Sequence, residues 1–340
     1  MLKISEVKNQ QIWDDFINNH GGHPLQLWGW GELKSRGNWR VCRIFVHQKT
    51  EKGEVLAAAQ ILTQKMPWPL KNFAYIPRGI LTISGKPLER EKMLQAVAEY
   101  CKTAIKPRPV ALSVEPDWEE FPNNLLKKGW IKARNTVLIP RTLILDLTKS
   151  TDEILMEMHK NNRQLVKKSA KNCAVRRLAT PKEFETAYKI YLETAKRAGF
   201  SIHSEKYYQD LRDLMGDNSP VWGAFSEDEL IAFSWIAKTK TTAFELYGGS
   251  NDKGRDLWAN YAIKWAVIQE LKEQGVERYD FNGLLNDSIS LFKKRFARHE
   301  NLLAGTFDRP LSKWYPLWSH GLPIGKKIVR SIRKILKKSH

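Results

Sequence analysis

The stretch YDFNGLLNDSISLFKKRF, residues 279–296, joins the end of a strand, a glycine turn and a basic aromatic segment. Its first three residues predict the tail of a buried strand, and Asn282-Gly283 predicts the turn that ends it. FKKRF, residues 292–296, predicts a helical segment that brings ammonium groups back over the sheet. Because a lysine held there can bind an anion or a developing oxyanion, we expect chemistry at this place.

The elements around this stretch alternate between strands and helices. The first half predicts a helix over 12–18, strands over 39–47, 54–65 and 73–76, a helix over 88–104 and a strand over 110–114. The second half predicts strands over 141–147, 174–178, 221–226, 229–238 and 241–248, a helix start over 148–152, a helix over 258–274 and the strand ending at 281. The order in the two halves is similar, which indicates an α/β (α+β) fold with a weak structural duplication.

Composition bounds the class of protein. The 340 residues are 42% hydrophobic, enough for two cores, and 56 Lys+Arg against 37 Asp+Glu give a formal charge of +19 that attracts polyanions. Three widely spaced cysteines without a metal-ligand pattern favour a reduced cytosolic compartment and predict no metal site. No signal-peptide or membrane-spanning run is evident, so we expect a protein that is neither exported nor membrane-spanning.

The C-terminal sequence GLPIGKKIVRSIRKILKKSH has isoleucines at helical spacing among lysines and arginines. This pattern predicts a basic amphipathic helix. Such a helix either lies on an anionic membrane surface or docks its apolar stripe on the first domain. The sequence leaves both interpretations open.

Several segments, in order, carry a resemblance to a known family. They are LQLWGWGELKSRGNW, RTLILDLTKSTDEIL, AKRAGFSIHSEKYYQDL, ELYGGS, WAVIQELKEQGVERYDFNG and LFKKRF. Together they resemble the Fem family of non-ribosomal peptidyltransferases (FemABX). With no long charged, heptad-patterned insertion, the chain resembles the compact, FemX-like type without the helical arm.

The resemblance implies two tandem GCN5-type acyltransferase-like domains, with mixed sheets flanked by helices and a cleft between the domains. Residues 1–143, completed by the segment from about 308 to 340, are expected to form the first domain, and residues 144–307 the second. GGSNDKGRDLWAN stands where a GCN5-type fold carries the glycine-rich loop for coenzyme A. Its double glycine lies at the strand end, which argues against acyl-CoA as donor, so no cofactor is expected.

The implied function is transfer of an amino acid from aminoacyl-tRNA to the stem-peptide amine of a UDP- or lipid-linked muramyl precursor, in cell-wall cross-bridge formation. The expected partners are aminoacyl-tRNA, the muramyl peptide and, through the basic tail, an anionic membrane. The expected place is the cytoplasm, at the inner face of the membrane if the tail binds lipid. The alternatives are an N-acyltransferase with another amine acceptor and a non-catalytic basic protein that binds tRNA or membrane. The transferred amino acid, the acceptor amine and the oligomeric state stay open.

For the reaction itself, the resemblance assigns transition-state stabilisation to the lysine after Phe292, which is Lys293. Lys294 leaves this assignment uncertain by one position. The competing interpretation is a solvated basic helix face that Phe292 and Phe296 pin to the core. Glu115, at the Glu-Pro end of a strand, is the candidate acid or base, taking a proton from the attacking ammonium.

The substrate-binding candidates come from the matched motifs and from aromatic neighbours of cations. They are Lys34, Trp39, Arg197, His203, Tyr207 and Tyr247. His203 stands where the family tends to carry an arginine, and it would be mostly neutral at pH 7. Arg197 is the nearby cation that could replace it. By the resemblance, Lys34 is expected to contact precursor phosphates, and Trp39 could line the same site, although the tryptophans around Lys34 are equally consistent with core packing.

A helix expected over 152–172 carries cations on one face. Lys160, Arg163, Lys167 and Lys171 have i, i+3/i+4 spacing. This face is a candidate groove for the tRNA acceptor stem, which would be bound through its phosphates. The alternative is an ordinary solvated helix face.

Overall fold

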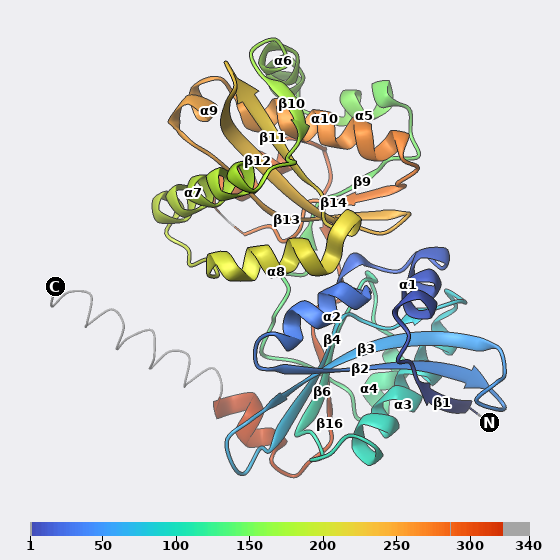
Figure 1. The fold of residues 1–340 in the computed structure, drawn as a ribbon. Coiled ribbons are helices and arrows are strands. Elements are labelled where there is room, and N and C mark those ends of the chain that lie inside the picture. The colour runs from blue at the N-terminus through green and yellow to red at the C-terminus, as the bar shows by residue number, and fades with distance from the viewer. Residues whose placement is uncertain (1, 286, 322–340) are drawn as a thin grey trace, which may run out of the picture. The chain divides into compact units, whose positions relative to one another are not determined.

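The computed structural model describes residues 2–285 and 287–321, which form two compact units (Figure 1). Unit 1 contains the chain up to Ile12, Lys34–Pro140 and the chain from Leu302 onward; unit 2 contains Trp13–Leu33 and Arg141–Asn301. Residues 13–33, expected in the first domain, thus cluster with unit 2. The expected boundaries after residues 143 and 307, and the cleft between domains, stay predictions. The amphipathic helix expected near the C-terminus lies outside the described residues.

Unit 1 is built on a mixed sheet. Its strands are β1 (Leu2–Glu6), β2 (Trp39–Gln48), β3 (Val55–Lys65), β4 (Asn72–Arg78), β5 (Leu81–Thr82), β6 (Ala111–Pro116), β7 (Ile131–Lys132) and β16 (Phe307–Pro310), and its helices are α3 (Pro87–Thr103) and α4 (Asn123–Lys127). The strand order is β1-β2-β3-β4-β6-β16-β7, with β5 beside β3. Leu94, Val97 and Cys101 of α3 are buried on the core that the sheet provides.

Unit 2 has a six-stranded sheet in the order β10-β11-β12-β13-β14-β9. The strands of this sheet are β9 (Ile144–Asp146), β10 (Ala174–Arg177), β11 (Val221–Ser226), β12 (Glu229–Lys238), β13 (Thr242–Ser250) and β14 (Arg278–Asp280). β8 (Arg141–Thr142) lies outside this sheet. The helices of unit 2 are η1 (Pro24–Gln26), α5 (Thr151–Glu157), α6 (Lys160–Ser169), α7 (Pro181–Ala198), α8 (Glu205–Met215), η2 (Gly216–Asn218), α9 (Asp252–Asp256), α10 (Ala259–Glu273) and α11 (Ser288–Lys294). α1 (Gln10–Asn19), α2 (Trp28–Ser35) and β15 (Asn301–Leu302) cross the division between the units.

The two sheets share one topological feature. Within the described residues, each sheet has a single parallel strand pair among antiparallel ones, β4–β6 in unit 1 and β13–β14 in unit 2. In both units the first strand of the parallel pair also forms an antiparallel pair with the strand before it, β3–β4 in unit 1 and β12–β13 in unit 2. The two parallel strands are connected through a helix, α3 or α10. The mixed α/β class and the duplicated order expected from the sequence are confirmed.

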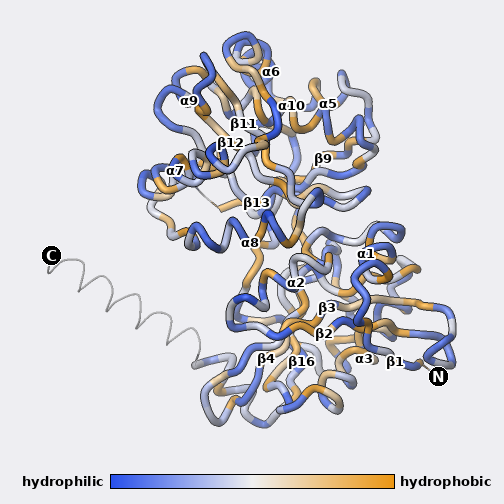
Figure 2. The backbone as a smooth tube through the Cα atoms, viewed as in Figure 1, coloured by the Kyte–Doolittle hydropathy of each residue, from blue (hydrophilic) through white to orange (hydrophobic). Residues whose placement is uncertain are grey.

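Hydrophobic residues concentrate in the strands of each unit, whereas the outer turns of α6 and α9 are hydrophilic (Figure 2). In unit 2, α10 packs on β11, β12 and β13, and α7 packs on β12 and β13. Ser150 and Glu153 form the capping box that begins α5, as the cluster at 148–152 predicted. None of the helices in the described part of the chain is long and apolar enough to cross a bilayer.

The helix expected over 152–172 is wrong as a single element. α5 ends at Glu157 and α6 begins at Lys160, because Met158 takes an extended conformation and its side chain is fully buried. The Arg163 guanidinium donates to the carbonyls of Met156 and Met158, at 3.2 and 2.8 Å, and so satisfies carbonyls that the break releases. Burial of Met158 therefore outweighs helix propensity here.

Candidate functional site

A cavity of about 470 Å³ opens in unit 2 where two parallel strands diverge. β14 ends at Asp280, opposite Phe244, while β13 continues to Ser250. Among the described residues, β13 therefore has no strand neighbour on this edge beyond Phe244. Side chains from α7, α10 and α11 line the space beside the exposed edge. Its volume is in the range of small-molecule sites.

A β-bulge at Leu246 sets the direction of the side chains on β13. Trp235 pairs with Tyr247 and Ile236 pairs with Glu245, so Leu246 has no residue opposite it. Glu245 and Tyr247 are two residues apart and would share a face of a regular strand. The extra residue instead sends Glu245 toward α10, where it contacts Lys264, and Tyr247 toward α7, where its ring contacts Tyr191.

Lys293 lies on α11 with its ammonium in the cavity wall. Asp287 caps the helix by accepting from the Ser290 N–H, and Phe296 is fully buried in the core. The Lys293 Nζ donates to the Phe281 carbonyl at 2.6 Å, and the side chain is 12% exposed. A strand end and a helical segment occur as YDFNGLLNDSISLFKKRF predicted, but the helix runs from Ser288 to Lys294 and not over 292–296. Asn282 takes the left-handed conformation at φ 62°.

Lys294 is placed differently. Its ammonium forms an ion pair with Glu300 at 2.7 Å, and it does not line the cavity. Of the two adjacent lysines, Lys293 is therefore the one whose charge reaches the cavity. Phe292 also lines the cavity and packs edge-on against Tyr261, 5.0 Å between ring centroids.

Glu245 holds a buried ionic network beneath the cavity. Its Oε2 accepts from Lys264 at 2.6 Å and from the Tyr279 hydroxyl at 3.0 Å, while Oε1 lies 3.8 Å from the Lys293 Nζ. Lys264 also donates to the Ser234 hydroxyl at 2.9 Å. The carboxylate is therefore bound mainly by Lys264, and Lys293 stays beyond hydrogen-bonding distance of it.

Burial and charge act in opposite directions on this network. Burial alone would raise the pKa of Glu245, but the charges of Lys264 and Lys293 outweigh it and hold the pKa below its usual value. Burial lowers the pKa of Lys264, against the opposing effect of Glu245. Burial, and then Glu245, raises the pKa of Tyr279 well above its usual value, so Tyr279 is a neutral donor.

The charged residues that line the cavity give it a positive balance. The cations are Lys264, Lys293, Arg197 and Arg255, and the only acid among the lining residues described is Glu245. Arg197, on α7, donates to the Ser250 carbonyl at 3.2 Å and is exposed at the rim. Such a site favours an anion or a developing oxyanion.

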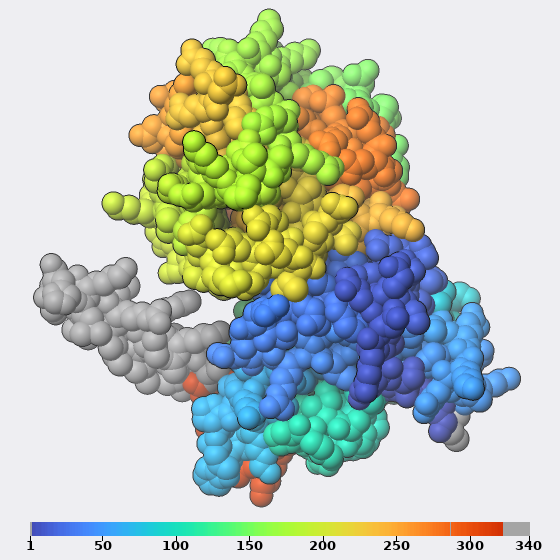
Figure 3. All heavy atoms as spheres, viewed as in Figure 1, coloured from blue at the N-terminus to red at the C-terminus, as the bar shows by residue number. Residues whose placement is uncertain are grey.

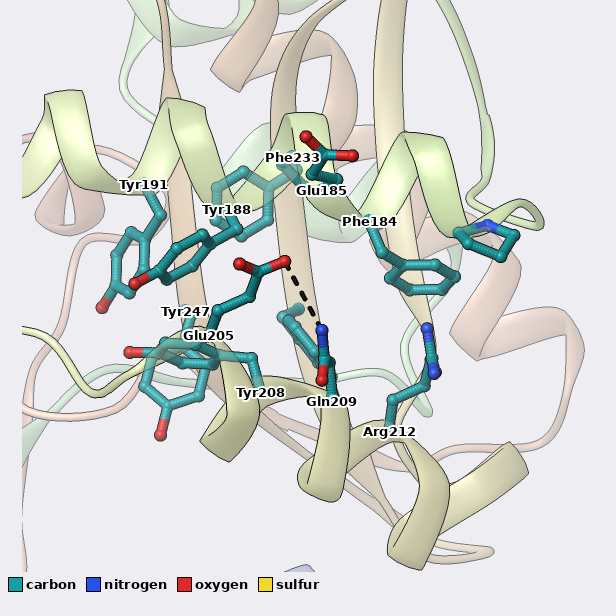
Figure 4. A pocket seen from close by; sticks show the side chains of 13 residues that line it. Phe184, Glu185, Tyr188, Tyr191, Glu205, Tyr208, Gln209, Arg212, Phe233 and Tyr247 are labelled. Atoms are coloured by element: carbon teal, nitrogen blue, oxygen red, sulfur yellow. Dashed lines mark hydrogen bonds between the residues drawn. The ribbon is translucent and has the colours of Figure 1, made fainter.

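A second, aromatic cavity of about 140 Å³ lies between α7 and α8 (Figures 3 and 4). In Figure 4, Tyr188 and Tyr191 from α7 face Tyr208 from α8. Tyr191, Phe233 and Tyr247 line both cavities. The two spaces therefore share a wall of three aromatic side chains.

Two predicted residues lie beside this wall. The His203 ring stacks on Tyr207 at 3.9 Å between centroids, and Tyr207 is hydrogen-bonded to Tyr247. Burial, and then the neighbouring tyrosines, raises the pKa of Tyr247 well above its usual value. The fold thus brings His203 and Tyr207 of one motif beside Tyr247 of another, although no contact tests their expected roles in binding.

The remaining substrate-binding candidates, Lys34 and Trp39, belong to unit 1. Trp39 lines a cavity of about 480 Å³ whose charged members, Arg40, Lys65 and Lys106, are all basic. Its ring also lies near those of Phe73 and Tyr75, which agrees with the alternative expectation that the tryptophans of this region pack in the core. Lys34 lies in the last turn of α2, where it also complements the negative end of the helix dipole.

Glu115 is buried and its carboxylate is fully engaged. It accepts from the backbone N–H groups of Val137 and Leu138 at 2.7 and 3.0 Å, from the Thr306 hydroxyl at 2.6 Å, and from the Tyr75 hydroxyl. These four donors fasten the 137–138 segment, Thr306 just before β16 and Tyr75 of β4 to β6. They disfavour the expected role of Glu115 as a proton acceptor in the reaction.

On the helix pair α5–α6, three of the four candidate tRNA contacts keep helical spacing, because Lys160, Arg163 and Lys167 lie at i, i+3 and i+7 on α6. Lys160 and Lys167 are exposed on α6, and Lys171 lies beyond its end. The Arg163 guanidinium donates to the carbonyls of Met156 and Met158. Three of the four candidates thus share a face of α6 and Lys171 lies beyond it, and tRNA binding by these cations stays a prediction.

The sequence interpretation missed Glu245 and Lys264. A signal was present in each case. Lys264 interrupts the apolar run ANYAIKWAVI and lies on the buried stripe of α10, three residues after Tyr261 and three before Val267. Glu245 is the one charged residue in the strand TAFELYGGS. Charges in two neighbouring buried elements predict a pair, because burying one alone is too costly.

Comparison with known proteins agrees with this architecture. The crystal structure of FemX matches with a TM-score of 0.79 at 19% identity, over 91% of this chain and 97% of FemX. A tandem GNAT protein from the clavulanic acid biosynthesis pathway matches with a TM-score of 0.51 at 12% identity, over 92% of this chain and 99% of that one. The fold is therefore that of a tandem GNAT-like protein.

The family follows from the sequence. The model of the FemAB family matches residues 128–224 and 226–319, more than half of the chain, and the chain belongs to this family. The lipid II:glycine glycyltransferase of Staphylococcus aureus (strain USA300) is 22% identical in an alignment 432 positions long. The alignment covers 99% of this chain and 99% of that protein. The chain is thus an acyltransferase of the FemABX type, as the sequence motifs implied.

Proposed function

We propose that the unit 2 cavity transfers an amino acid from aminoacyl-tRNA to a stem-peptide amine of a UDP- or lipid-linked muramyl precursor. Family membership supports the reaction class, and the glycyltransferase relative, which by its name acts on lipid II, supports the acceptor class. The observation that carries the proposal is the Lys293 ammonium, fixed at 2.6 Å from the Phe281 carbonyl in the wall of a positive cavity.

In the proposed step the neutral acceptor amine attacks the ester carbonyl of the aminoacyl-tRNA. A C–N bond forms, the oxyanion of the tetrahedral intermediate accepts from Lys293, and the ester C–O bond breaks. The ribose oxygen leaves and is protonated by the proton that the amine releases. No covalent enzyme intermediate is needed. Loss of one oxyanion donor in other enzymes costs about 2.7–4 kcal/mol of transition-state stabilisation.

Lys264 supports this role by neutralising Glu245. Its ammonium is 2.6 Å from the carboxylate, whereas that of Lys293 is 3.8 Å away. The charge of Lys293 is therefore not neutralised by Glu245 and is available to the reaction centre. Arg197 and the Tyr207–Tyr247 pair, at the same cavity and its aromatic wall, are the proposed contacts to precursor phosphate and sugar.

The test is transfer of a labelled amino acid from charged tRNA to UDP-linked and lipid-linked muramyl pentapeptide, followed by mass spectrometry. We expect Lys293→Met to lower kcat about 10²–10³-fold. Lys294→Met is the matched control, because its ammonium pairs with Glu300 outside the cavity. Both variants are checked for folding by circular dichroism.

Three outcomes separate the alternatives. Full turnover by a folded Lys293→Met variant removes the catalytic assignment. Transfer to other amines but to no muramyl peptide indicates an N-acyltransferase with a different acceptor. Binding of tRNA without any transfer indicates a non-catalytic binding protein. The proposed tRNA donor places the reaction in the cytoplasm, at the membrane face when the precursor is lipid-linked.

A further inference from the structure

Unit 1 exposes two tryptophans that touch each other. Trp68, in the connection between β3 and β4, is 84% exposed, and Trp314, just before the helical residues 315–321, is 36% exposed. Their ring centroids are 6.3 Å apart. Leu317, 49% exposed, lies one helical turn beyond Trp314. Large apolar side chains gathered on a surface mark an interaction site more often than single ones do.

The tryptophans project from an ordered base. Trp318 is buried, with its ring 4.4 Å from that of Phe73, and the Tyr315 hydroxyl donates to Asp308 at 3.0 Å. Tyr315 and Trp318 thus hold one side of the short helix on the sheet, and the opposite side carries Leu317. The exposed rings are therefore held outward by packing beneath them.

The β3–β4 connection is also tied down. The Met66 N–H donates to Lys71 O and the Leu70 N–H to Pro67 O, both at 3.0 Å. Met66 and Leu70 pack against the small core that contains Phe73 and Trp318. Trp68 is at the tip of this closed loop, so its outward position is a property of the fold.

The charged side chains of the described segments 64–72 and 311–321, which carry this surface, are cations. Lys65 and Lys71 flank the loop, and the Lys313 ammonium lies 5.5 Å from the centre of the Trp314 ring. Residues 64–72 and 311–321 contain no aspartate or glutamate. The sequence that follows, residues 322–340, adds seven lysines and arginines and no acid. The surface therefore combines exposed indoles with positive charge.

We propose that this surface, Trp68, Trp314, Leu317, Lys65, Lys71 and Lys313, docks on an anionic lipid bilayer. Indole rings favour the membrane–water interface, because the ring leaves water while the N–H stays near polar headgroups. The lysines add attraction to anionic headgroups. The rings protrude from a loop tip and a helix, which suits insertion between headgroups; a protein partner would need a matching hollow. This inference is independent of the proposed reaction.

The test is co-sedimentation of the full chain with sucrose-loaded vesicles of phosphatidylcholine alone or with 30% phosphatidylglycerol added. We expect binding to the anionic vesicles that weakens with salt. Trp68→Ala/Trp314→Ala should lower the partition coefficient about 10-fold or more. Leu192→Ala, a change at an exposed apolar residue on α7, is the matched control and should bind as the unchanged protein does. Lys65→Gln/Lys71→Gln/Lys313→Gln should reduce the preference for anionic vesicles.

Thermal melts followed by circular dichroism show whether each variant is folded, and no tRNA or precursor is needed, so failure here leaves the proposed transfer untouched. Binding of the folded double tryptophan variant equal to that of the unchanged protein overturns the proposal. That result would be expected if a protein partner or residues 322–340 covered the tryptophans. It would also be expected if the basic tail alone bound the vesicles, in which case charge-neutralising glutamines at Lys326, Lys327 and Lys334 would abolish binding instead.

Discussion

The Lys264 ammonium and the Glu245 carboxylate form a buried ion pair, 2.6 Å apart, with side chains that are 6% and 9% exposed. The pair joins α10 to β13 directly beside Lys293. It leaves one net positive charge among the three groups, since Glu245 can neutralise only one of two ammoniums. The stability of unit 2 and the charge at the cavity are therefore linked through the same carboxylate.

Removing Glu245 from this pair should destabilise the fold more than removing both partners. We expect Glu245→Gln to lower the free energy of unfolding by about 3–5 kcal/mol, because the Lys264 ammonium stays buried without its carboxylate. Lys264→Met should lower it by less, because Lys293, 3.8 Å from Glu245, can take over the ion pair. The double variant should lose less stability than Glu245→Gln alone. Urea denaturation of the four proteins in a double-mutant cycle measures the coupling. Simple additivity would show that the pair does not act as a unit.

Lys264→Met should also slow the proposed transfer. Glu245 would then pair with Lys293 and take up the charge that stabilises the oxyanion. We expect kcat to fall about 10-fold, or about 1.4 kcal/mol, with little change in KM. Lys272→Met is the control on the same helix, since its ammonium donates to the Leu147 carbonyl at 2.9 Å. Equal kinetics for the two variants would contradict the link between Lys264 and Lys293.

The exposed lysines of α6 and Arg163 should respond differently to substitution. Lys160→Ala/Lys167→Ala/Lys171→Ala should weaken tRNA binding and reduce the slope of log K against log salt by about 1 for each phosphate that the variant no longer binds. Arg163→Ala should instead lower the melting temperature, because its guanidinium satisfies the carbonyls of Met156 and Met158. An unchanged salt slope in the triple variant would place tRNA elsewhere.

Glu115→Gln should affect stability more than chemistry. The amide can accept from some of the four donors but loses charge-assisted hydrogen bonds to Val137 and Leu138. We expect the free energy of unfolding to fall by about 1–3 kcal/mol, with kcat of the folded fraction changed less than about 2-fold. If turnover by the folded variant instead fell by about two orders of magnitude, as removal of a general acid or base does, Glu115 would be restored to that role.

Glu183 should contribute to stability above pH 4.5 and lose that contribution in acid. The hydrogen bond from Arg176, with those from the Thr180 and Ala179 N–H groups, lowers its pKa from 4.5 to about 2. A lowered pKa in the fold means that the stabilisation is complete above the unfolded value and disappears as pH falls toward 2. Glu183→Gln should cost about 1 kcal/mol at pH 7 and much less near pH 2, by denaturant titration at each pH. If the stability cost of Glu183→Gln stayed constant with pH, the ionised Glu183 carboxylate would not be the source of this stabilisation.

Much of the local structure follows from local sequence. The strands expected over 221–226 and 229–238 occur with those limits, because their apolar runs end at turn residues. The capping box at Ser150 and the turn at Asn282 are likewise encoded within a few residues. The family resemblance pointed to Lys293 as the candidate but left Lys294 open, and only the structure shows which of the two lines the cavity.

By itself, then, the sequence determined the order of helices and strands, the tandem acyltransferase class and the segment that carries Lys293, since these depend on periodicity, caps and motifs along the chain. Tertiary structure alone decided the bulge at Leu246, the helix break at Met158 and the pairing of Glu245 with Lys264. Each of these depends on partners distant in sequence. Burial of Met158 and neutralisation of a buried charge are energies that arise only when the elements pack together.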